Sequence, residues 1–106
     1  MSTKHVHRFR ISVEKIGDPV GQTGTSPPLA FEVQNHDDIL AIVDRVRAGT
    51  AFTADEASAL ALGVKLLGGV VLAHRHDPLF ADLQPPLRGF IGNLKSHVAS
   101  SATQGQ

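Results

Sequence analysis

The stretch Ala57–Ala73, ASALALGVKLLGGVVLA, decides the fold, because its only charged residue is Lys65. Placed on a helix at 100° per residue, its apolar side chains form two separate stripes. A helix that is apolar on most sides has to be buried on most sides, so we expect the central helix of a small domain. The first stripe is Leu60, Val64, Leu67 and Val71, and the second is Leu62, Leu66, Val70 and Ala73. The residues expected in the core or in a dimer interface are Leu60, Leu62, Val64, Leu66, Leu67, Val70 and Val71.

Clear signals mark both ends of this helix. Thr53–Glu56 has the Thr-x-x-Glu pattern of a capping box, in which each side chain binds the other residue's backbone amide. Asp77-Pro78 predicts the other end, because a residue before proline disfavours the α conformation. The stretch is shorter than the ~20 apolar residues of a membrane span and has Lys65 near its centre, so we interpret it as part of a soluble domain. Three glycines predict the close approach of another backbone: Gly63, Gly68 and Gly69.

Two alternating segments near the N-terminus predict an antiparallel β-hairpin. The first lies within His5–Ile16, and in both segments every other residue is apolar. Gly17–Pro28 between them is rich in glycine and proline, which predicts a loop. On the polar face, Arg8 and Arg10 are expected to meet Glu32 in exposed pairs worth about 0.2–1 kcal/mol each. The apolar face consists of Phe9, Ile11, Val13, Leu29, Phe31 and Val33.

Two more helices are predicted, one before and one after the central helix. Asn35–Asp38 supplies caps for the first, and Gly49 is expected to end it in a left-handed conformation. A short turn over Asp77–Leu83 and a break at Gln84-Pro85-Pro86 precede the second. The first helix has an apolar face of Ile39, Leu40, Ile42, Val43 and Val46. The second has one of Leu87, Phe90, Ile91, Leu94 and Val98.

These elements predict a single α+β domain over residues 1–98. A two-stranded antiparallel hairpin would pack on three helices, with a central helix that is apolar nearly all round. Residues 99–106 are small and polar and are expected to form a flexible C-terminal tail. Both strands would remain sheet edges, open to pairing with another chain. The open edges and the two-sided helix predict a homodimer, and a monomer with its helices wrapped around the central one is the alternative.

Three stretches of the chain resemble one small bacterial family. They are KHxxRFRI over Lys4–Ile11, LxFExxNHDD over Leu29–Asp38, and LALGVKLL followed by HR and PLF over Leu60–Phe80. In this order and spacing they are similar to the domain-of-unknown-function family thirty-eight sixty-one (DUF3861), over most of residues 4–96. The resemblance implies a small cytoplasmic bacterial domain, and it carries over no catalytic residue.

The composition excludes several classes of function. Ten Lys and Arg residues balance ten Asp and Glu residues, so no net field draws in nucleic acid or an anionic membrane. The absence of cysteine excludes disulfides, thiol catalysis and thiolate metal sites. No cofactor is indicated. Met1–His5 lacks the apolar core of a signal peptide, which predicts a cytoplasmic protein.

Histidine is the residue type whose pattern points to metal binding. On a strand, His5 and His7 lie on the same side, which suits two ligands of one transition metal. With His36 and Asp37 they would form a metal or small-ligand site. The alternative is that His5 and His7 lie at the frayed start of a strand. His74 is expected at the negative end of the central helix, where a positive charge is favourable.

The segment Asn35–Asp38 permits a second chemistry. Asp37 and Asp38 beside His36 have the groups that proton transfer needs, so a small acid/base enzyme is one hypothesis. Asn and Asp at a helix start are also what capping requires, and we favour capping. No serine lies in a nucleophile-elbow pattern.

We therefore predict a non-catalytic, homodimeric interaction or accessory module. Its expected partners are a second copy of itself and an unidentified protein, with neither nucleic acid nor membrane. A histidine-dependent metal- or ligand-binding protein and a small acid/base enzyme are the alternatives. The buried central helix also predicts that Leu67→Ala destabilises the domain by about 2–5 kcal/mol, the range for a buried leucine.

Overall fold

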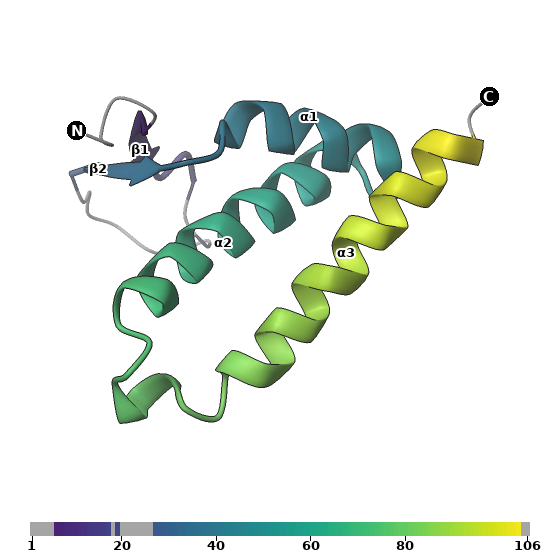
Figure 1. Ribbon diagram of the computed structural model, residues 1–106. Coiled ribbons are helices and arrows are strands. Elements are labelled where there is room, and N and C mark those ends of the chain that lie inside the picture. The colour runs from purple at the N-terminus through teal and green to yellow at the C-terminus, as the bar shows by residue number, and fades with distance from the viewer. Residues whose placement is uncertain (1–5, 18, 20–26, 105–106) are drawn as a thin grey trace. The chain divides into compact units, whose positions relative to one another are not determined.

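The computed structural model describes residues 6–17, 19 and 27–104, in two compact units, Met1–Asp37 and Asp38–Gln106. The first unit contains a two-stranded antiparallel sheet and the second contains three α-helices (Figure 1). The α+β class, with one hairpin and three helices, is therefore confirmed. The packing of the hairpin on the helices and the division into 1–98 and 99–106 stay predictions.

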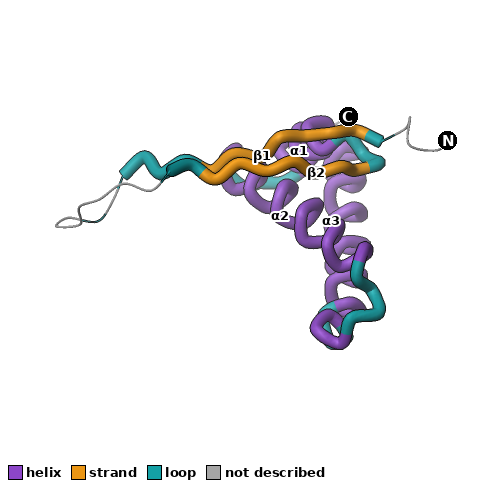
Figure 2. The backbone as a smooth tube through the Cα atoms, turned by 90° about the vertical axis from the view of Figure 1, so that its left-hand side faces the viewer, coloured by secondary structure: helices purple, strands orange, loops and turns teal. Residues whose placement is uncertain are grey.

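The hairpin has the register that the alternation predicts. β1 (His7–Val13) and β2 (Leu29–Asn35) pair along their whole length (Figure 2). Phe9 faces Val33 and Ile11 faces Phe31, so the apolar residues share one face of the sheet. Most of the predicted loop over residues 17–28 lies outside the described residues.

The first helix begins where the acidic segment ends. α1 (Ile39–Gly49) has Asp38 as its N-cap, and the carboxylate of Asp38 accepts a hydrogen bond of 3.1 Å from the N–H of Leu40. Ile39 and Val46 are buried, as predicted. The expectation that Leu40 widens the apolar face was wrong, because Leu40 lies about 100° from Ile39 round the helix and is 67% exposed.

Gly49 has a different role from the predicted left-handed cap. It is the buried last residue of α1, and the extended residue Thr50 follows it as the C-cap. A Cβ atom at Gly49 would lie 2.9 Å from Cγ1 of Val98 and 3.1 Å from its Cα. Glycine is therefore required here because the last helix passes directly against α1.

The second helix has the predicted ends. α2 (Ala54–Ala73) begins with the capping box: the N–H of Glu56 donates to Oγ1 of Thr53 and the N–H of Thr53 donates to Oε1 of Glu56, both at 3.1 Å. The N–H of its C-cap, His74, donates to the carbonyl oxygens of Val70 and Val71. Local hydrogen bonding thus defines α2 at both ends.

A short turn leads into the last helix. The 3₁₀ helix η2 (Pro78–Phe80) follows its predicted N-cap, Asp77. α3 (Gln84–Gln104) then starts at Gln84, so the predicted break at Gln84-Pro85-Pro86 was wrong. Proline fits in the first turn because the N–H groups there have no partner within the helix. α3 also continues past Val98 into the predicted tail.

α1 is the helix that holds the helical unit together. It packs against both α2 and α3, whereas α2 and α3 touch each other at few positions and diverge in Figure 1. The centre of the core consists of Val46, Ala57 and Ala61, which are 4%, 0% and 1% exposed. Alanines at this position let α1 and α2 approach closely. The partly buried residues around them are Ile42, Val43, Leu60 and Val98.

Candidate functional site

α2 has two apolar sides, and the chain buries one of them. Its buried residues, Ala57, Ala61 and Val71, lie within about 40° of one line along the helix. About 180° away runs a second apolar line, which we call the outer stripe. Within it Leu62 and Leu66 are half-buried and Val70 is 51% exposed. The outer stripe consists of Ala59, Leu62, Leu66, Val70 and Ala73.

The sequence led us to expect that α2 is shielded from water nearly all round. The described part of the chain does not shield it to that extent. Only 17% of the most apolar window of α2 is buried. Leu60 and Val64 are half-buried, and Leu67 is 41% exposed. The reason is that α1 covers one side of α2 while α3 meets it at few positions. The expected 2–5 kcal/mol for Leu67→Ala therefore has to be lowered, because that range holds for a buried leucine.

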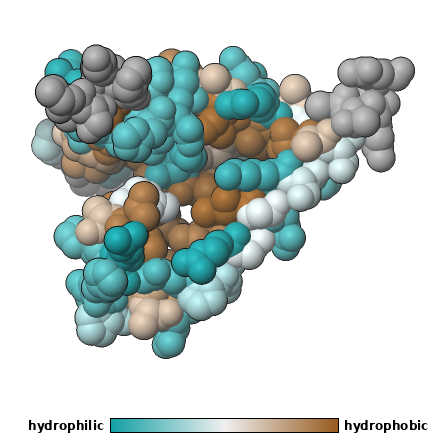
Figure 3. Space-filling model, viewed as in Figure 1, coloured by the Kyte–Doolittle hydropathy of each residue, from teal (hydrophilic) through white to brown (hydrophobic). Residues whose placement is uncertain are grey.

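A second apolar surface lies between α2 and α3. Figure 3 shows apolar side chains gathered in the hollow where these two helices diverge. Leu67 on α2 and Phe90 on α3 are 41% and 42% exposed. The helical unit thus presents apolar side chains on two faces.

The length of α2 removes one argument against a membrane. In the part of the chain that the structure describes, α2 is the one helix long and apolar enough to cross a bilayer, with 20 residues and a mean hydropathy of 1.6. The expected length limit of ~20 residues is therefore reached. The absence of a membrane partner stays a prediction, which depends on Lys65 and on the balanced charge.

The glycines of α2 have no close neighbour in the described chain. At Gly63, Gly68 and Gly69, an added Cβ atom would meet nothing within 4 Å. The expected close approach of another backbone is therefore not made within the described residues. Gly63 and Gly69 flank the outer stripe and leave the α2 backbone accessible there.

The polar face of the hairpin contains the charge cluster that the sequence predicts. Arg8 donates to one carboxylate oxygen of Glu32 at 2.9 Å, and Arg10 donates to the other at 3.2 Å. These bonds hold the pKa of Glu32 below its ordinary value of 4.5. The side chains are 71%, 71% and 50% exposed, so solvent screens the pairs and they contribute little to stability.

This cluster gives a titration that can be tested. We expect the carboxyl group of Glu32 to titrate below pH 4.5, and its pKa to rise toward that value in Arg8→Ala/Arg10→Ala. The folded-state pKa is depressed, so the small stabilisation is present above pH 4.5 and is lost as the pH falls through the lowered pKa. Carboxyl-carbon NMR measures this. Arg45→Ala, outside the hairpin, is the control, and an unchanged curve in the double variant would contradict the pairing.

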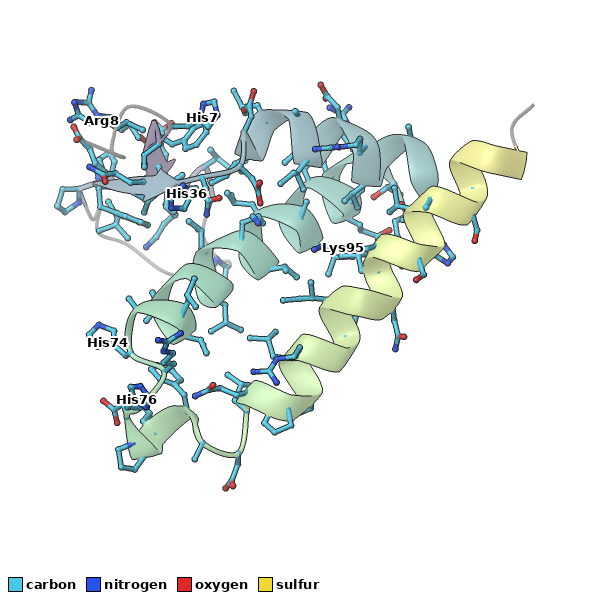
Figure 4. The ribbon with its side chains drawn as sticks, in the orientation of Figure 1. His7, Arg8, His36, His74, His76 and Lys95 are labelled. Carbon is cyan, nitrogen blue, oxygen red and sulfur yellow. The ribbon has the colours of Figure 1, made fainter. Side chains whose placement is uncertain are left out.

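The four proposed metal or ligand residues are only partly placed. His5 lies outside the described residues, and His7, His36 and Asp37 are all exposed. Figure 4 draws the ring of His7 above β2 and that of His36 below it, and His7 stacks on Phe9 with 6.1 Å between ring centroids. Among the described residues no group of three His, Asp or Glu side chains is close enough to hold a metal ion. The complete set stays a prediction.

The acidic segment before α1 performs the capping that the sequence favours. Oδ1 of Asn35 accepts from the N–H of Asp37 at 2.9 Å, and Asp38 caps α1. Both side chains are therefore turned onto backbone amides. Of the three residues in the acid/base hypothesis, Asp38 is thus used for capping, and the hypothesis itself stays a prediction.

The turn after α2 contains a feature that sequence reasoning missed. A shallow hollow is lined by residues 72–77, including His74 and His76, both labelled in Figure 4. The amide of Gln84 donates to the carbonyl oxygen of Arg75 and so ties the start of α3 to the end of α2. The Gln-Pro-Pro sequence gives no signal for this contact, since the two residues meet only through the turn.

These observations define a small α+β chain. Its main surface feature is the set of exposed apolar side chains on the helical unit. The family model described as a domain of unknown function with solved structure (DUF3861) matches residues 7–96, so the chain belongs to the DUF3861 family. It is similar to a crystal structure of a protein of unknown function (eca1910) from Pectobacterium atrosepticum SCRI1043. The identity is 31% and the TM-score 0.73, over 85% of this chain and 97% of that chain. No curated protein matches.

Proposed function

We propose that this protein is a non-catalytic interaction module that acts as a homodimer. The observation that supports this proposal is the amount of apolar surface that one copy leaves in contact with water. In the helical unit, side chains on opposite sides of α2 remain exposed, among them Val70 at 51% and Leu72 at 66%. Exposed apolar patches mark protein or membrane interaction sites.

The proposed module is cytoplasmic and acts on protein rather than on nucleic acid. Its ten basic and ten acidic residues give no net charge, and nucleic-acid binding depends largely on neutralising phosphates. The partner beyond the second copy is a protein with an apolar surface, because that is the chemistry exposed on the helical unit.

Sedimentation equilibrium tests the proposal. We expect a dimer at micromolar concentrations, with dissociation on dilution. Flotation with neutral and anionic lipid vesicles is the companion measurement, since α2 is long enough to enter a bilayer. A monomer at several hundred micromolar, or a chain that floats with vesicles in place of dimerising, would refute the proposal.

A further inference from the structure

We draw no further inference here: the strongest candidate, the apolar hollow between α2 and α3 with Leu67 and Phe90 on its sides, carries none because nothing in the structure shows what covers it.

Discussion

Replacing Ala61 by leucine is expected to destabilise the helical unit by about 3 kcal/mol, the upper part of the range for adding methylene groups to a packed core. Ala61 is 1% exposed and lies on α2 where this helix contacts α1, next to Val46 and Ala57. A leucine has no room there unless α1 and α2 separate. Urea unfolding followed by circular dichroism measures the change, at one protein concentration because self-association adds to apparent stability.

Ala48→Leu is the matched control for this variant. Ala48 lies in α1 but is exposed, so the same side chain should change the free energy of unfolding by no more than about 0.5 kcal/mol. Equal destabilisation by both variants would mean that Ala61 is not at a close contact between the two helices. The arrangement of α1 on α2 described above would then be wrong.

Replacing Gly49 by alanine is the second change with a large expected effect, a destabilisation of about 1–3 kcal/mol. The added Cβ atom would lie 2.9 Å from Cγ1 of Val98, 3.1 Å from its Cα and 3.2 Å from its carbonyl oxygen. Two of these three atoms belong to the backbone, so α3 itself has to move. The double variant Gly49→Ala/Val98→Ala is expected to recover only part of the loss, since it removes only the contact with Cγ1.

Gly89→Ala is the control of opposite sign. Gly89 lies inside α3, and an added Cβ atom there meets nothing within 4 Å. Alanine is the better helix former by about 0.5–1 kcal/mol, so this variant is expected to be more stable than the natural chain. If Gly49→Ala stabilises the chain as well, α3 does not pass against α1 as closely as described.

Features that depend on neighbouring residues were predictable from the sequence. The capping box of Thr53 and Glu56, the cap at Asp77 and the pairing of Arg8 and Arg10 with Glu32 are all confirmed. In each case a hydrogen-bonding group meets a partner within a few positions along the chain or across a regular register. The geometry of one helix turn or of one strand pair determines such contacts, so they can be predicted without knowledge of the tertiary packing.

Features that depend on distant residues were not predictable. In the sequence, Gly49 indicates the end of a helix. Only the position of Val98 in the structure shows that the glycine allows close packing there. Pro85 and Pro86 predicted a break before the last helix, although the first turn of a helix accepts proline. Leu40 is apolar and lies in α1, but the buried face of that helix is too narrow to include it, so its side chain is exposed.

The candidate surface was predictable in kind but not in place. The sequence shows that α2 is apolar on most sides, which led to the expectation of two leucine-rich stripes in the core or in a dimer interface. The structure instead buries the alanines at 57 and 61, and larger side chains such as Leu67 and Val70 stay partly exposed. Periodicity ranks residues by hydrophobicity, whereas close packing of two helices selects small residues at the point of contact. Sequence alone cannot separate these two criteria.

The position of α1 between the two long helices has an evolutionary consequence. Its eleven residues have to fit two neighbours at once, whereas the far ends of α2 and α3 are held together at the turn between them, where Gln84 binds Arg75. Sequence change within the family should therefore be slowest in α1, the shortest α-helix, and fastest where α2 and α3 diverge. New binding preferences could arise there without rebuilding the scaffold.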